Sequence, residues 1–169
     1  IIPHILKRHS VADMKPGDLG LLEPAVATER TLAALEKGTP DAKRGEKLFA
    51  SQGCVACHAM GKDDPPEGPN LHDIAVRYSP AELITSIMNP GATVSQGFPT
   101  HIIEMKDGQA HMGFALKESG DEIVLRTMAA MTVVVPKDGI KTHHREEKVS
   151  SMTPGLVNNL KPEELADLL

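Results

Sequence analysis

The pentapeptide Cys54-Val55-Ala56-Cys57-His58 guides the interpretation of the whole chain. Two thiols three positions apart, followed at once by a histidine, form the spacing by which c-type haem is attached. Each cysteine sulfur adds to one haem vinyl group, and the next residue can place its imidazole on the iron. Because the chain has only these two cysteines, the pattern predicts one covalently attached haem c, with His58 as an axial ligand.

Three other uses of a Cys-x-x-Cys pair fit the sequence less well. Structural zinc needs four ligands, but there is no second cysteine pair, and His143-His144 lack the spacing of a zinc finger. A thioredoxin-like redox pair needs a βαβ context, which the flanking sequence does not supply. A disulfide across so short a loop would be strained.

The composition agrees with a large flat group in the core. The chain has no Trp, one Tyr and three Phe, which is few for its 169 residues. A haem would fill the space that aromatic rings usually occupy. The eight methionines suit such a core, because flexible thioether side chains fill gaps around a rigid plate.

Charge and hydropathy argue against a nucleic-acid-binding protein and against a transmembrane helix in this chain. A net charge of −5 argues against a nucleic-acid partner, since nucleic-acid binding needs a clustered basic face. No apolar run reaches the roughly 18 residues of a transmembrane helix, and Ile1-Ile2-Pro3-His4 does not resemble a signal peptide. Because bacteria attach c-type haem outside the cytoplasmic membrane, we expect an exported, periplasmic protein or a domain excised from one.

Two helices are predicted before the haem motif. The first covers residues 28–37 and ends at Gly38. The second begins at Thr39-Pro40-Asp41, with Thr39 as cap, and continues to Ala50. Glycine in a helix costs about 1 kcal/mol relative to alanine, so Gly45 predicts a close crossing with another helix. It shares one face with Leu48 and Phe49.

The segment after the motif combines a loop with a helix. A ligating histidine normally donates its second ring nitrogen to a carbonyl, and Pro69 in Gly68-Pro69-Asn70-Leu71 is the candidate to supply it, although the pattern also suits an ordinary turn. Ser79-Pro80-Ala81-Glu82 forms a capping box. The helix that follows should bury Leu83, Ile84, Ile87 and Met88.

Alternating apolar residues predict a small antiparallel sheet. Residues 100–105 and 109–116 flank Lys106-Asp107-Gly108, which signals a tight hairpin. A two-residue turn at Asp107-Gly108 would pair Met105 with Ala110, Ile103 with Met112, His101 with Phe114, and Glu104 with His111. Further strands are expected at residues 122–127, 131–135 and 140–145, giving four or five strands.

These pieces resemble a class I cytochrome c. The resemblance rests on the helix with Gly45 and Phe49, the haem motif, Gly68-Pro69-Asn70-Leu71, the loop at Met152, and a terminal helix opened by Pro162-Glu163-Glu164-Leu165. More narrowly, the chain resembles the haem-binding domain of multidomain exported proteins of planctomycetes and verrucomicrobia. That family shares Asn89-Pro90, Lys106-Asp107-Gly108, and Ser151-Met152 ahead of Pro154-Gly155-Leu156.

The resemblance covers about residues 41–169 and implies the domain organisation. We expect a mainly α cytochrome c fold of class I, α+β overall because of an antiparallel β insertion at about residues 98–148. Residues 1–40 would then be an N-terminal extension or the tail of a preceding domain.

The resemblance also places the sixth iron ligand at Met152, although Thr153 here precedes the proline that usually follows at once. His101 is the main rival, because it falls on the apolar face of the predicted hairpin, while His143 and His144 are expected to be solvated. The remaining candidates are expected to pack in the core or the sheet: Met88, Met105, Met112, Met128 and Met131. Arg77 or Lys62 could pair with a haem propionate.

The expected function is that of a mono-haem, one-electron carrier. Its partners would be a redox donor and acceptor, including a dehydrogenase domain of the same parent protein. The alternative is a haem-based sensor or small-ligand-binding module with an open or displaceable sixth position. An enzyme such as a peroxidase would need a distal acid–base pair, which is not evident. The β insertion could shield the haem, bind a partner or form a homodimer through an edge strand.

Overall fold

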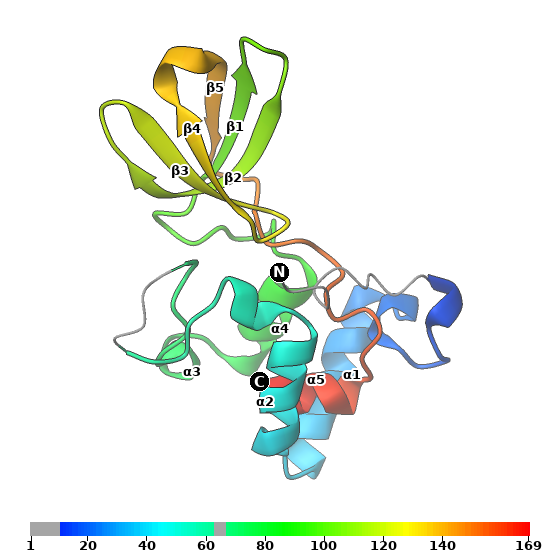
Figure 1. Cartoon of the computed structure of the whole chain (residues 1–169). Coiled ribbons are helices and arrows are strands. Elements are labelled where there is room, and N and C mark those ends of the chain that lie inside the picture. The colour runs from blue at the N-terminus through cyan, green and yellow to red at the C-terminus, as the bar shows by residue number, and fades with distance from the viewer. Residues whose placement is uncertain (1–10, 63–66) are drawn as a thin grey trace. The chain divides into compact units, whose positions relative to one another are not determined.

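The computed structural model describes residues 11–62 and 67–169, which form two compact units (Figure 1). The first contains residues up to 55, residues 73–89 and residues 154–169; the second contains residues 56–72 and 90–153. Each unit has its own hydrophobic core. Residues 1–10, which belong to the expected extension, lie outside the described part of the chain.

The first unit is helical. Its α-helices are α1 (Pro24–Lys37), α2 (Ala42–Ser51), α3 (Ile74–Arg77), α4 (Pro80–Met88) and α5 (Pro162–Leu168). Helix α5 packs against α1 and α2, and α1 also contacts α4 (Figure 1). The buried core residues of this unit are Leu19, Ala27, Ile84, Val157, Leu160 and Leu165.

Helix α1 begins at Pro24, four residues before the predicted start, because proline fits the first position of a helix. It buries Ala27 and Thr31, and the Thr31 hydroxyl donates to the Ala27 carbonyl at 2.8 Å. The segment ahead of it is also anchored, since the Leu19 N–H donates to the Leu160 carbonyl at 2.7 Å. The domain division at residue 40 stays a prediction, but α1 shares its core with α4 and α5.

Helix α2 has a different cap from the predicted one. Asp41, not Thr39, is the N-cap, and its carboxylate accepts from the N–H groups of Lys43 at 3.0 Å and Arg44 at 3.2 Å. A carboxylate can accept both bonds and also complements the positive end of the helix, which favours Asp41 over a single hydroxyl. The predicted close crossing at Gly45 is present, opposite α5.

Helix α4 confirms the predicted capping box. The Ser79 N–H donates to the Glu82 carboxylate at 2.7 Å, and the Glu82 N–H donates to the Ser79 hydroxyl at 3.4 Å. Ile84 is fully buried, while Ile87 and Met88 pack against the core from partly buried positions.

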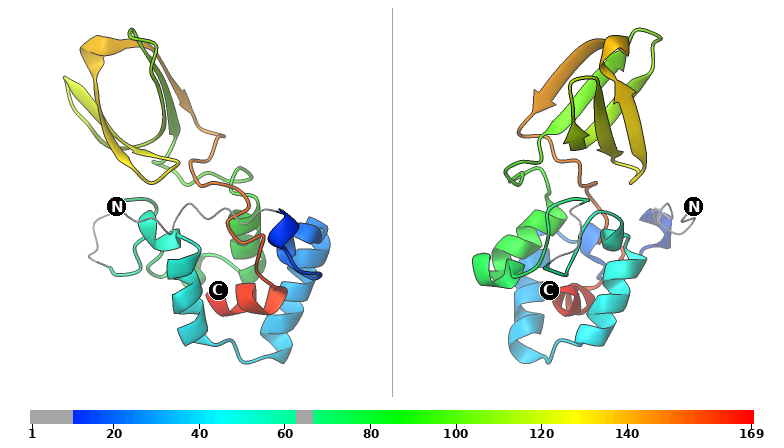
Figure 2. Two further views of the ribbon diagram at one scale, coloured as in Figure 1. Left: turned by 45° about the vertical axis from the view of Figure 1, so that its right-hand side comes forward. Right: turned by 60° about the vertical axis from the view of Figure 1, so that its left-hand side comes forward.

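The second unit contains the predicted antiparallel sheet, with five strands. They are β1 (Thr100–Met105), β2 (Ala110–Glu118), β3 (Glu122–Thr127), β4 (Thr132–Pro136) and β5 (Ile140–Glu146). The order is β4-β3-β2-β1-β5, and every neighbouring pair is antiparallel. The sheet is strongly curved (Figure 2). One face buries Ile103, Met105, Ile123, Leu125 and Val135.

The predicted register of the first hairpin is wrong by one residue. Ile103 pairs with His111, Glu104 with Ala110, and His101 with Gly113. The loop has three residues, because the Met105 N–H donates to the Gln109 carbonyl at 2.8 Å and Gly108 adopts a φ of 89°. A three-residue loop with a left-handed glycine is a common hairpin connection.

This register separates residues that were expected to face each other. Phe114 lies on the opposite face from His101 and packs edge-on against Phe98, with 5.5 Å between ring centroids. Glu104 does not face His111; its carboxylate accepts from Lys141 Nζ on β5 at 2.6 Å. A shift of one residue exchanges the two faces of a strand, which explains why several predicted contacts changed together.

Candidate haem site

The haem motif follows directly from α2. Gly53, with a φ of 82°, provides the turn after the helix, and Cys54–Ala56 forms one turn of 3-10 helix. Cys54 and Cys57 are both half-buried, whereas Val55 between them is 57% exposed. Both thiols are therefore placed on one short turn that reaches the surface, as attachment to one porphyrin edge requires.

The His58 ring is held by the loop that was expected to hold it. Its Nδ1 lies 2.7 Å from the carbonyl oxygen of Pro69. Because a carbonyl only accepts, Nδ1 must carry the proton in this hydrogen bond, which leaves the Nε2 lone pair for a metal. The tautomer and ring orientation are those of an axial imidazole ligand.

The loop behind His58 packs against the motif backbone. A Cβ at Gly68 would lie 2.4 Å from the Cys57 carbonyl oxygen, so only glycine fits at this position. The Leu71 N–H donates to the Ala59 carbonyl at 2.8 Å. Asn70 closes the loop, since its side-chain amide donates to the Gly61 carbonyl at 2.9 Å. These contacts fix the position of Pro69 relative to His58.

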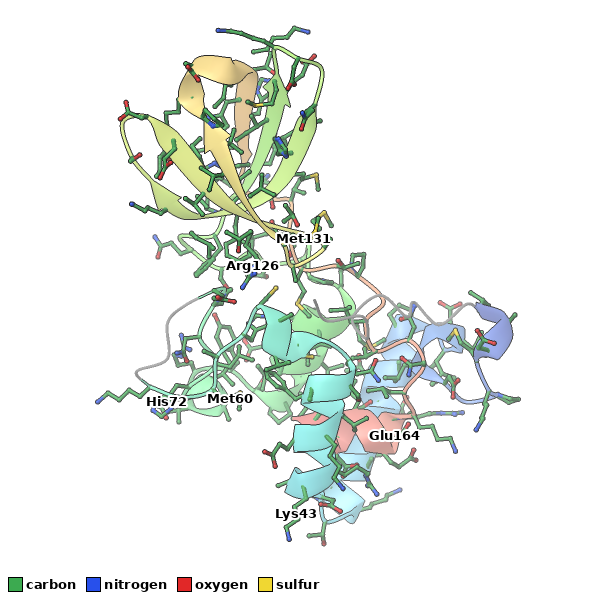
Figure 3. All side chains as sticks on the ribbon, viewed as in Figure 1. Lys43, Met60, His72, Arg126, Met131 and Glu164 are labelled. Carbon is green, nitrogen blue, oxygen red and sulfur yellow. The ribbon has the colours of Figure 1, made fainter. Side chains whose placement is uncertain are left out.

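Further contacts lie at the outer end of this loop. His72 Nδ1 lies 3.3 Å from the Met60 carbonyl oxygen, and both residues are exposed (Figure 3). The His72 N–H donates to the Asn70 side chain at 2.7 Å. Met60 is therefore part of the outer loop.

Arg126 on β3 is a site residue that the sequence analysis missed. Its guanidinium forms an ion pair with Glu67, next to Gly68, and donates to the Ala130 carbonyl at 3.0 Å and the Thr132 hydroxyl at 3.2 Å (Figure 3). Burial raises the pKa of the Cys57 thiol, and the nearby Arg126 charge opposes that rise. The signal in the sequence was a cation placed directly after the apolar residues Ile123-Val124-Leu125.

Met152 lies half-buried in the loop between β5 and α5. Its N–H donates to the Ser150 hydroxyl at 3.1 Å. Met152, Cys57, His58 and Pro69 belong to the second unit, whereas Cys54 belongs to the first. The roles of these five residues in holding the haem stay predictions from the sequence.

The rival ligand His101 has a partner of its own. It is 3% exposed, and its Nδ1 lies 3.0 Å from Nε2 of His143 on β5. Burial, His143 and Arg145 lower the pKa of His101, and burial and Arg145 lower that of His143. Contrary to the prediction, His143 is half-buried and paired with His101, whereas His144 is exposed, as predicted.

The other candidates lie in varied surroundings. Met105 and Met88 pack in the two cores, as predicted, but Met128 and Met131 are 37% and 59% exposed. Arg77 stands over the Tyr78 ring, 5.9 Å from its centroid. Among residues 11–62 and 67–169, no group of three or more His, Cys, Asp or Glu side chains could hold a metal ion.

The fold and site together define a c-type haem protein. The two thiols and the oriented imidazole fit the donor set that covalent haem needs. The family model described as cytochrome c matches residues 42–169, so the chain belongs to the cytochrome c family. No curated protein matches the chain.

Membership of this family establishes the cofactor and the general role. The chain binds covalent haem c, with Cys54 and Cys57 fitting the attachment motif, and it is a haem-based electron-transfer module. In the described part of the chain, no helix is both long and apolar enough to cross a membrane.

Proposed function

We propose that this protein carries single electrons between exported redox partners, with one haem iron held by His58 and Met152. The observation that carries the proposal is the 2.7 Å contact between His58 Nδ1 and the Pro69 carbonyl. It fixes the imidazole with Nε2 available to the iron. When bound, the haem supplies a one-electron ferric–ferrous couple.

Two strong axial ligands suit electron transfer because little geometry changes with oxidation state. The Met152 thioether would also raise the reduction potential relative to a second histidine. His101 is less suitable as the sixth ligand, since its Nδ1 is engaged with His143 and its ring is buried in the sheet. The exposed Val55 between the half-buried cysteines supports electron exchange with partners at the thioether edge.

The proposal extends to the setting of the protein. Cytochrome c domains are commonly exported, which supports a periplasmic location, and the resemblance to multidomain planctomycete and verrucomicrobial proteins supports a dehydrogenase domain as the attached electron donor. Residues 41–169 would form the class I domain, with residues 98–148 as its insertion. The edge strands β4 and β5 offer backbone groups for a homodimer.

Haem attachment is tested by denaturing mass spectrometry after expression in cells that mature c-type cytochromes. The intact chain should carry the mass of one haem, and Cys54→Ser combined with Cys57→Ser should carry none. A bare polypeptide mass for the unchanged chain would contradict the proposal.

The sixth ligand is tested by optical spectroscopy with a potentiometric titration. We expect low-spin ferric haem with the weak sulfur-to-iron charge-transfer band, and Met152→Ala should lose the band and lower the potential. Met131→Ala, at an exposed methionine, is the matched control and should leave both unchanged. High-spin ferric haem that binds carbon monoxide readily when reduced would instead support the sensor.

A further inference from the structure

The proposed electron carrier gives the β insertion no role at the haem itself, yet both proposed ligand segments are bonded to the insertion. The second unit contains the sheet, the His58 segment (residues 56–72) and the Met152 segment (residues 147–153). Thr100 on β1 contacts the Met152 segment, and Arg126 on β3 contacts the His58 segment.

Thr100 is the first residue of β1 and is fully buried. Its hydroxyl donates to the Val149 carbonyl at 2.7 Å and lies 2.7 Å from the Ser151 hydroxyl. A hydroxyl has one proton, so Thr100 donates to Val149 and must accept from Ser151. One buried side chain therefore holds the chain on both sides of Ser150, which lies two residues before Met152.

The local geometry of Met152 depends on the same short segment. The Met152 N–H donates to the Ser150 hydroxyl at 3.1 Å, so Ser150 and Ser151 orient the backbone from which the sulfur extends. Strand β5 ends at Glu146, which pairs with Thr100 across the sheet. The end of β5 therefore lies beside the start of β1, and Thr100 bonds the segment that follows β5.

Arg126 makes the corresponding contact on the His58 side. The residue is 9% exposed, and its guanidinium joins the β3–β4 hairpin to Glu67. Glu67 directly precedes Gly68, which packs on the Cys57 carbonyl, and Pro69, which accepts from His58. The Nε–H of Arg126 is buried without a hydrogen-bond partner among the described residues. The charge of Arg126 is paired with the Glu67 carboxylate.

We propose that the inserted sheet is a structural part of the haem site, in which Thr100 positions the Met152 segment and Arg126 positions the His58 segment. This inference rests on the proposed ligation by His58 and Met152. Both are positioning residues, because each acts through the segment that it holds. The insertion then sets the strength of axial ligation and the reduction potential.

The role of Thr100 is tested with two variants. Thr100→Val keeps the shape of the side chain but removes the hydroxyl, and Thr100→Ser keeps the hydroxyl. Thr142→Val is the matched control, because Thr142 lies exposed on β5 of the same sheet. Thr100→Val should weaken the sulfur-to-iron band and increase the affinity of ferric haem for added imidazole. Amide exchange at residues 149–152 should accelerate about tenfold, as expected when two hydrogen bonds are lost. Thr100→Ser should keep the band, the imidazole affinity and the amide exchange rate close to those of the unchanged protein.

The Arg126 arm uses Arg126→Gln and Glu67→Gln, singly and together, with Arg145→Gln as the control on the same sheet. Arg126→Gln removes a buried cation near Cys57 and leaves Glu67 unpaired, and both changes favour ferric iron. The potential should therefore fall, while Glu67→Gln should raise it. The double variant should show non-additive effects, as residues in contact do.

The outcomes separate this inference from the proposed function. If the unchanged protein lacks the sulfur-to-iron band, ligation by Met152 fails, but faster exchange at residues 149–152 in Thr100→Val still supports the positioning role. The inference is overturned if Thr100→Val leaves exchange, band and imidazole affinity unchanged, or if Thr142→Val has the same effects. Additive potentials for Arg126 and Glu67 would overturn its second half. If Thr100→Val does not fold, Ser151→Ala removes one of the two bonds and gives the same comparison.

Discussion

Gly45 on α2 faces the main-chain carbonyl of Asp167 on α5 so closely that a Cβ at residue 45 would lie 2.0 Å from that oxygen. The two helices therefore meet backbone to backbone. The Asp167 side chain strengthens the same contact, because its carboxylate accepts from the Asp41 N–H at 2.8 Å and pairs with the Arg44 guanidinium. The start of α2 and the end of α5 are joined by a glycine and a buried acid.

Gly45→Ala should destabilise the protein. Alanine gains about 1 kcal/mol of helix propensity, but the methyl group forces α2 and α5 apart, and overpacking of this kind costs roughly 1–3 kcal/mol or more. We expect a net loss in the free energy of unfolding, measured by urea denaturation. Lys47→Ala, at an exposed position of α2, should change it little. Unchanged stability in Gly45→Ala would show that the helices can separate without cost.

Asp167→Asn should lower the free energy of unfolding at neutral pH. It should also make that free energy fall less between neutral and acid pH. Burial raises the pKa of Asp167, but bonds from Arg44 and the Asp41 N–H outweigh burial and keep the pKa below its ordinary value. The stabilisation is present above the unfolded pKa of about 3.9 and is lost as the pH falls through the folded pKa. Breaking these bonds should cost about 1–3 kcal/mol at pH 7. Urea denaturation at pH 7 and pH 3 should show a smaller difference for Asp167→Asn than for the unchanged chain.

Gly108→Ala should destabilise the sheet. A non-glycine residue in the left-handed region costs about 1–2 kcal/mol, and Gly108 has a φ of 89°. Gly120→Ala is the control, because Gly120 lies in the next β-turn with open space around it and no positive φ. Thermal unfolding followed by circular dichroism should separate the two variants. Equal midpoints would contradict the three-residue loop.

Stability should decline as the pH falls below about 6.5, because charging the His101–His143 pair is unfavourable. Burial, His143 and Arg145 lower the pKa of His101, while Glu118 opposes them, so the unfolded chain binds protons more readily. The contribution is complete above the unfolded pKa of about 6.5 and is lost as the pH falls towards the folded value. His101→Gln should give a shallower slope of unfolding free energy between pH 7.5 and 5. An unchanged slope would assign the effect to other groups.

The sequence predicted those features whose signals are local. The Ser79–Glu82 capping box, the strands at residues 100–105 and 122–127, and the Pro69 carbonyl beside His58 all depend on residues close together in the chain. Their backbone geometry follows from short-range hydrogen bonding and proline constraints. The haem motif is local in the same sense, because five consecutive residues carry it.

Contacts between distant segments could not be read in this way. The pairing of His101 with His143 depends on the register of β1 with β5, and the pairing of Arg126 with Glu67 joins a strand to a distant loop. The register of β1 with β2 depends in turn on whether Gly108 ends a loop of two residues or three. The cap of α2 was predicted at Thr39 because Thr and Asp are both accepted N-cap residues, whereas the bonds to Lys43 and Arg44 select Asp41. The fold class was predictable from local patterns, while the contacts that Arg126 and His101 make with distant segments were not.

Leu19 and α1 lie ahead of the matched residues 42–169, yet they share one core with Leu165. Trimming the chain to residues 42–169, for instance to fuse it to an electrode or a reductase, would remove Leu19 and α1. The side of α5 that they cover would then be exposed to solvent. The shortened protein would expose aliphatic side chains and aggregate more readily. Transplants of this haem module should therefore begin upstream of Asp18.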